Sequence, residues 1–217
     1  MAPPRKLDQT IRAVSADTDD EFERLLEAFM KVCGQHLPRF LVDLDETFLT
    51  HDEHFGTCPG ADVLFDDLGG DLIEWQAKIY EHLKVRPCNT KFLEILKNNI
   101  ERVVFITSRD ESHRIGTEKQ VRSLLGDDCA MPKIVYCETG DKGAEVRRLP
   151  GIRGAEAVLF VDDKHRHVMT VSLALVEAGV RNGLCVRYDA RRDEVLKTMD
   201  KKKVIEAFEA FAKENPL

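Results

Sequence analysis

The sequence lacks the features by which several protein classes are recognised. Its 217 residues include six cysteines but no C-x-x-C pair, so we do not expect a zinc ribbon or a thioredoxin-type site. No apolar run is long enough to cross a bilayer, and no apolar stretch follows Arg5 and Lys6 as it would in a secretory signal. We therefore expect a cytoplasmic protein with reduced thiols and no membrane association.

The chain also lacks an excess of positive charge. Its 39 acidic and 32 basic residues give a formal net charge of -7. Nucleic acids and anionic membranes attract basic proteins, so this charge disfavours nucleic acid as a partner, although a local basic patch could still bind it. Internal repeats and low-complexity segments are absent as well, and 43% apolar residues suffice for one domain with a core.

Short apolar runs alternate with helical patterns along most of the chain. Five of these runs are typical of buried parallel strands and cover residues 39–43, 102–107, 133–137, 157–162 and 183–188. Helical spacing between them predicts an α/β fold, in which helices flank a five-stranded parallel sheet. Right-handed connections place the first strand in the middle of the sheet, in the Rossmann-like order 3-2-1-4-5.

Two regions lie outside this alternation. Residues 1–38 form an N-terminal region, which we predict to be a loose arm over 1–17 followed by a helix. Within the main domain, 39–217, residues 49–88 contain turn signals and one helical pattern. We expect these residues to form a small helical insertion after the first strand, placed to lie over a site.

A capping box indicates where one of the connecting helices begins. Thr117 and Gln120 have the spacing in which a hydroxyl and an amide satisfy the free N–H groups of a first helical turn. We therefore predict that the helix after the second strand starts near Thr117.

Polar residues gather where the predicted strands end. They are Asp43, Asp45 and Thr47 after the first strand, Thr107 and Ser108 after the second, Asp162 and Asp163 after the fourth, and Lys142 at a predicted helix start. Ligands bind to parallel α/β sheets beyond the carboxyl ends of the strands, where the strand order reverses. Carboxylates next to a buried strand are unfavourable unless a cation compensates them, although they could instead form a turn or cap a helix.

These residues resemble the four motifs of the haloacid dehalogenase-type (HAD) phosphohydrolase superfamily, over about residues 40–188. The motifs are D-x-D-x-T after an apolar strand, a strand that ends in Thr or Ser, a lysine near a helix start, and an apolar strand that ends in an acidic pair. Their matches here are Asp43-Leu44-Asp45-Glu46-Thr47, Val103–Thr107, Lys142 and residues 158–163. The resemblance implies a HAD fold with a small cap or none.

The resemblance also implies an enzyme, a phosphatase that works through an aspartyl phosphate. Asp43 would be the nucleophile, and Asp45 would be the general acid and then the base. A Mg²⁺ cofactor would be bound by Asp43, by the backbone carbonyl of Asp45 and by the pair Asp162 and Asp163, of which we favour Asp163 as the direct ligand.

The same resemblance assigns a phosphate-binding role to Thr107, Ser108 and Lys142. Each of two assignments has a simpler alternative. The Thr107 hydroxyl could bind the backbone at the strand end, and Lys142 could be an exposed lysine at a helix start.

The motifs also bear on the substrate. Asp45 favours phosphoryl transfer over dehalogenation, because the dehalogenase relatives lack this second aspartate. Short spacings between the motifs leave no room for a large cap, so either a phosphorylated small molecule or a phosphoprotein could reach the site. We expect substrate selectivity to depend on His54, Trp75, Arg86 and Arg109.

Within the superfamily, the chain looks closer to a largely uncharacterised bacterial branch than to the phosphatases of the RNA polymerase tail, whose first motif it shares. Members of that branch often carry an export signal, which we do not find here. The resemblance lies in Leu68-Gly69-Gly70-Asp71, Trp75-Gln76, Thr107-Ser108-Arg109, Asp141-Lys142-Gly143 and Val186-Arg187-Tyr188.

Other functions stay open on the same residues. A phosphomutase or another phosphotransferase would use the same motifs, and a binding protein could keep the fold without the activity. A transition-metal hydrolase would need imidazole ligands, from His51 and His54 or from His165 and His167. No H-E-x-x-H spacing is present, so we interpret these histidines as solvated loop residues.

Overall fold

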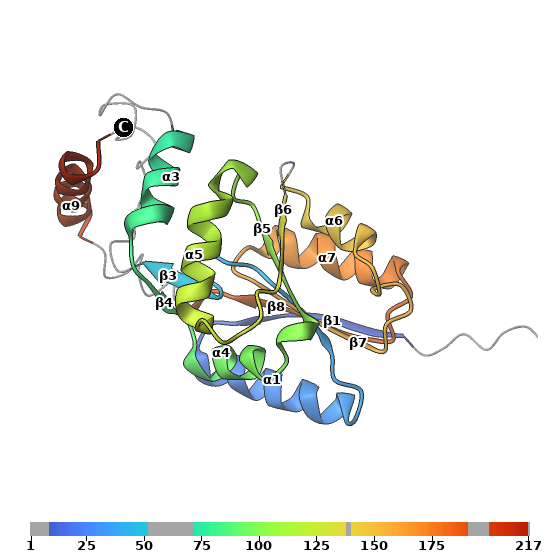
Figure 1. Ribbon diagram of the computed structural model, residues 1–217. Helices are drawn as coiled ribbons and strands as arrows, with labels where there is room; N and C mark the ends of the chain where they lie inside the picture. Colours follow the sequence, from blue (N-terminus) through green and yellow to red (C-terminus); the bar gives the residue numbers. More distant parts are fainter. Residues whose placement is uncertain (1–8, 52–71, 138–139, 191–199, 217) are drawn as a thin grey trace, which may run out of the picture.

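A six-stranded parallel sheet forms the centre of the protein (Figure 1). The computed structural model describes residues 9–51, 72–137, 140–190 and 200–216. The strands, in their spatial order, are β1 (Thr10–Ala16), β8 (Asn182–Tyr188), β7 (Ala157–Asp162), β2 (Arg39–Val42), β5 (Val103–Thr107) and β6 (Lys133–Tyr136). The predicted α/β class is confirmed, and the five predicted strands lie in the predicted order.

The prediction of five strands and of a loose arm over residues 1–17 was wrong at β1. This segment pairs with β8 from Thr10 opposite Asn182 to Ala16 opposite Tyr188. Only Ala16 of the strand is buried, so its side chains carry little of the apolar alternation by which a strand is recognised. Backbone hydrogen bonding to an open sheet edge stabilises such a strand largely independently of its side chains.

Helices cover both faces of the sheet (Figure 1). Because successive strand residues point to opposite faces, Phe40 and Val42 pack with one group of helices and Leu41 with another. The first group contains α1 (Asp19–Cys33) and α4 (Thr90–Lys97), and the second contains α6 (Lys142–Arg148) and α7 (His165–Glu177). β1 belongs to the main sheet and α1 to its core, so both pack as part of the main fold.

The helix after β5 begins earlier than predicted. A 3-10 turn (Glu111–His113) leads directly into α5 (Arg114–Leu125), so Thr117 and Gln120 lie inside the helix. The predicted capping box was therefore wrong. Both side chains instead accept hydrogen bonds from the buried Arg109, so they do not bind the free backbone N–H groups of a first helical turn. A second 3-10 turn (Ile100–Arg102) precedes β5.

The insertion after β2 contains more than a helix. Its ends form an antiparallel pair of short strands, β3 (Leu49–His51) and β4 (Val85–Pro87), and α3 (Leu72–His82) lies between them. The C-terminal helix α9 (Lys201–Glu214) packs against α3, with the rings of Trp75 and Phe208 5.3 Å apart. Figure 1 shows the two helices together at one end of the molecule.

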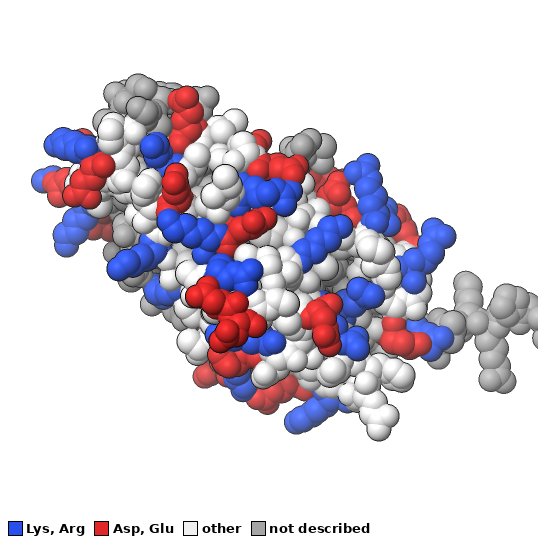
Figure 2. All heavy atoms as spheres, in the orientation of Figure 1, with Lys and Arg blue, Asp and Glu red and all other residues white. Residues whose placement is uncertain are grey.

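Charged side chains of both signs are intermixed on the face shown in Figure 2. The net charge of -7 is therefore not gathered into one patch among the described residues of that face. None of the helices in the described ranges has both the length and the apolar character that crossing a bilayer requires.

Candidate active site

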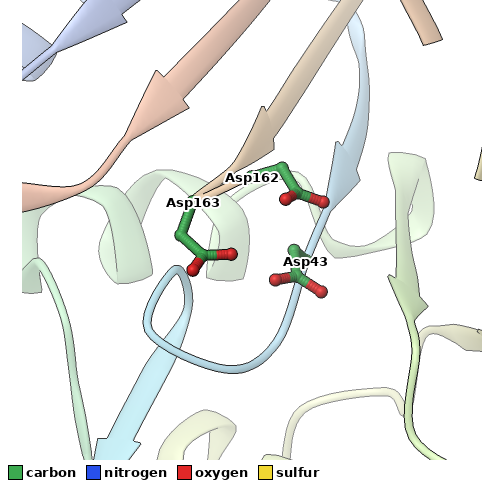
Figure 3. Close-up of side chains that lie close together, drawn as sticks. All are labelled: Asp43, Asp162 and Asp163. Atoms are coloured by element: carbon green, nitrogen blue, oxygen red, sulfur yellow. The ribbon is translucent and has the colours of Figure 1, made fainter. Parts of the chain in front are cut away.

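Three carboxylates meet at the carboxyl ends of β2 and β7, which are neighbours in the centre of the sheet. Asp43 follows β2, Asp162 ends β7 and Asp163 comes next in the chain. One oxygen of each lies within 4.8 Å of the others, and all three residues are buried (Figure 3). Buried anions at this spacing repel each other strongly, so the cluster requires positive charge.

Lys142 supplies part of that charge. Its Nζ donates hydrogen bonds to Asp43 Oδ1 and, at 2.7 Å, to Asp162 Oδ2. The side chain is only 1% exposed, so Lys142 is not the exposed lysine of the simpler alternative. Its helix lies close to α7, since a Cβ atom on Gly143 would lie 2.7 Å from the Thr170 carbonyl oxygen. The glycine thus permits the close packing that brings the first turn of α6 to the carboxylates.

The protonation of Asp43 depends on the charge around it. Burial raises the pKa of Asp43 to about 8, against the attraction of Lys142 and with further contributions from Asp162, Asp163 and Asp45. Lys142 alone therefore does not keep this carboxylate fully ionised at neutral pH. A divalent cation among the three carboxylates would lower that pKa, and hard oxygen ligands are those that Mg²⁺ prefers.

Several protein donors bind the carboxylate of Asp162. Besides Lys142, the backbone N–H of Lys164 donates to Oδ1 at 2.8 Å, and His167 Nδ1 lies 3.1 Å from both oxygens. These contacts hold Asp162 as the partner of Lys142. All three carboxylates of the cluster, Asp43, Asp162 and Asp163, offer an oxygen that could hold a cation.

Asp45 forms a bidentate ion pair with Arg109. The guanidinium reaches Asp45 Oδ2 through Nε at 2.9 Å and Oδ1 through Nη2 at 2.6 Å. Desolvation alone would raise the pKa of Asp45, but Arg109 outweighs it and lowers the pKa to about 2. In this arrangement the carboxylate of Asp45 is ionised.

Arg109 was predicted to influence substrate selectivity, but its donors bind protein groups. The third nitrogen of the guanidinium, Nη1, donates hydrogen bonds to Thr117 at 3.2 Å and to Gln120 at 2.9 Å. The ring of Tyr80, from the insertion, lies 3.7 Å from the centre of the guanidinium. Arg109 therefore positions Asp45 and connects it to α5 and to α3.

The predicted phosphate ligands on β5 differ in exposure. Thr107 is fully buried at the strand end, and its hydroxyl accepts a hydrogen bond from the backbone N–H of Arg109 at 3.1 Å. This is the backbone contact of the simpler alternative. Ser108 is exposed, and Thr47 of the first motif lies 3.5 Å from Asp43 Oδ2 through its hydroxyl.

The remaining residues predicted for selectivity lie in different environments. Trp75 is buried against α9, where it stabilises the contact between the two helices. Arg86 is exposed on β4, opposite Thr50 of β3, and its charge offsets only part of the rise that burial causes in the pKa of Glu46. His54 lies outside the described residues.

Among the described residues, no histidine belongs to a group that could hold a metal ion. His165 is exposed, but His167 is buried and bound to Asp162, so interpreting His167 as a solvated loop residue was wrong. The same interpretation was wrong for His51, which is buried in β3 and lies 3.0 Å from the Gln120 side chain through Nε2. The fourth, His54, again lies outside the described residues.

Sequence reasoning missed Glu46, the variable residue of the first motif. It is buried, and both carboxylate oxygens accept a hydrogen bond from Thr50, at 3.0 and 3.1 Å. Burial raises its pKa to about 7, and the charges of Asp45 and Asp163 contribute. Its φ of 57° lies in the left-handed region, which a residue other than glycine seldom adopts, so Glu46 lies in a tight turn. Spacing alone gives no signal for such a turn.

The comparisons with known proteins add little to this geometry. No family model matches the chain, and no curated protein sequence matches it. Two solved structures of a class C acid phosphatase from Bacillus anthracis, one of them described with bound tungstate, are similar in fold. Their TM-scores are 0.48 and 0.45, at 16% and 18% identity, and each alignment covers 90% of this chain and 86% of the other. Similarity at this level does not establish a shared family or function.

Proposed function

We propose that the protein is a phosphatase that hydrolyses a phosphate monoester, with Asp43 as the nucleophile. The supporting observation is the contact of Asp43 with Lys142 at the carboxyl end of the central strand, beside Asp163. A carboxylate at this position can attack phosphorus, and the adjacent ammonium group can balance the charge of the phosphoryl oxygens.

The reaction requires two displacements. A carboxylate oxygen of Asp43 forms a bond to phosphorus as the bond to the leaving oxygen breaks, and that oxygen takes a proton from Asp45. Water then attacks the phosphorus of the aspartyl phosphate, Asp45 accepts the proton of the water, and phosphate leaves with Asp43 restored. Asp45 must be protonated at the first step, which requires its ion pair with Arg109 to loosen.

A Mg²⁺ ion fits the donors that are present. Asp43 and Asp163 would hold it with carboxylate oxygens, and we expect the backbone carbonyl of Asp45 to contribute. When bound, the ion would neutralise charge on the phosphoryl oxygens and lower the pKa of Asp43. Lys142, which Asp162 holds by a hydrogen bond, would add a second positive charge beside the phosphoryl group. Ser108 is exposed and could donate a hydrogen bond to a phosphate.

The proposed substrate is a phosphate monoester carried by a small molecule or by a protein.

The first experiment is hydrolysis of p-nitrophenyl phosphate with and without Mg²⁺. We expect release of nitrophenol that EDTA abolishes and that Asp43→Asn lowers by more than about 1,000-fold, because the nucleophile is lost. Asp128→Asn, an exposed aspartate away from the cluster, is the matched control. Activity that survives EDTA would contradict the metal, and a fully active Asp43→Asn variant would contradict the nucleophile.

A further inference from the structure

Four buried side chains form a continuous line from α7 to the proposed nucleophile. His167 contacts Asp162, Asp162 contacts Lys142, and Lys142 contacts Asp43. They are 2%, 0%, 1% and 5% exposed, respectively. The four residues lie in α7, β7 and α6 and directly after β2. Only the tertiary structure therefore brings them into line.

The contacts of His167 define which ring nitrogen carries the proton. The Nε of Arg166 donates a hydrogen bond to His167 Nε2 at 3.1 Å, so Nε2 must accept. In a neutral imidazole the proton then lies on Nδ1, the nitrogen 3.1 Å from both oxygens of Asp162. His167 is thus a directed donor to this carboxylate.

The orientation of Asp162 determines where the lysine can lie. Lys142 Nζ is held between Asp43 and Asp162, so a rotation of the Asp162 carboxylate would draw the ammonium group away from Asp43. The backbone N–H of Lys164, two residues after the end of β7, holds one oxygen of Asp162. His167 fixes the carboxylate from a second direction, on α7.

We propose that His167 is a positioning residue, which holds Asp162 so that Lys142 stays in contact with Asp43 during phosphoryl transfer. This role rests on the proposed function. His167 would affect the reaction only through Asp162 and Lys142. Partners of this kind typically change activity by about 10–100-fold when they are removed.

Two substitutions separate the position of the donor from the presence of a side chain. In His167→Asn the amide nitrogen can replace Nδ1, whereas in His167→Gln it lies where Nε2 was. We expect His167→Gln to lower kcat/KM for p-nitrophenyl phosphate by about 10–100-fold. We expect His167→Asn to stay within about threefold of the unsubstituted protein, because the hydrogen bond to Asp162 is kept. His165→Gln, the exposed neighbour in α7, is the matched control and should be unchanged.

The kcat/KM values of the two His167 variants decide whether His167 positions Asp162. Equal losses in His167→Asn and His167→Gln, or no loss in either, would overturn the positioning role. Thermal unfolding of both variants shows whether a loss comes from a damaged fold, since equal melting temperatures with unequal kcat/KM support positioning.

A spectroscopic measurement tests the contact without any activity. The ring nitrogen shifts of His167 in ¹⁵N NMR distinguish the two neutral tautomers, and we expect the form with the proton on Nδ1. A proton on Nε2 would overturn the inference even in an active enzyme. A protein with this tautomer but without activity towards phosphate esters would instead overturn the proposed function, and the positioning role with it.

Discussion

Arg109 forms a two-point ion pair with Asp45, with nitrogen to oxygen distances of 2.9 and 2.6 Å. The ring of Tyr80 covers the same guanidinium at 3.7 Å. Tyr80 belongs to α3 of the insertion, whereas Asp45 belongs to the turn after β2. Arg109 therefore links α3 of the insertion to the proposed general acid.

Removing the Tyr80 ring should weaken this connection. We expect Tyr80→Leu to lower the free energy of unfolding by about 1 kcal/mol, from the lost contact between ring and cation. It should also lower kcat for alkyl phosphates more than for p-nitrophenyl phosphate, because a poor leaving group depends on a proton from Asp45. Tyr80→Phe keeps the ring and is the control. Equal effects on both substrates would argue against a link to Asp45.

The two aspartates after β7 should respond differently to neutralisation. Asp163→Asn should raise the Mg²⁺ concentration needed for half-maximal activity by about 10–100-fold, because a ligand is lost. Asp162→Asn should mainly lower kcat, because it releases Lys142. Titration of Mg²⁺ against activity for each variant measures the difference. The reverse pattern would make Asp162 the metal ligand.

Loss of the buried lysine charge should destabilise the fold. Lys142→Met leaves Asp43 and Asp162 without their shared cation, which we expect to cost about 3 kcal/mol in urea unfolding. In the Asp43→Asn background the same change should cost less, because one unpaired carboxylate is already gone. Identical losses in the two backgrounds would show that Lys142 and Asp43 are not energetically coupled.

Stability should depend on pH through Asp43. Its pKa is raised to about 8 in the folded protein, so the folded state binds a proton that the unfolded chain releases above its ordinary pKa near 4. Without a divalent cation, the free energy of unfolding should therefore fall as the pH rises from about 4 towards 8. Asp43→Asn should remove this contribution. Urea unfolding of both proteins in EDTA at pH 5 and pH 8 measures it, and parallel losses in the two would contradict the raised pKa.

Several elements were predictable because local patterns specify them. The apolar runs identified five strands. A helix was predicted after residue 17, and Thr18, whose side chain accepts a hydrogen bond from the N–H of Glu21, caps the start of α1. β1 was not predictable in this way, because an edge strand depends on the neighbour that it joins. The misplaced start of α5 has a similar cause, since Thr117 and Gln120 bind an arginine that the sequence places several residues earlier.

The sequence by itself determined the α/β class, the order of five strands and the polar residues at their ends, because side-chain periodicity and chain connectivity are local properties. Only the tertiary structure decided what those residues contact. It placed Lys142 between two carboxylates, fixed Asp45 to Arg109, buried Trp75 against α9 and turned His167 towards Asp162. These pairs join residues from separate elements, and their geometry follows from how helices and strands pack together, which no spacing along the chain encodes directly.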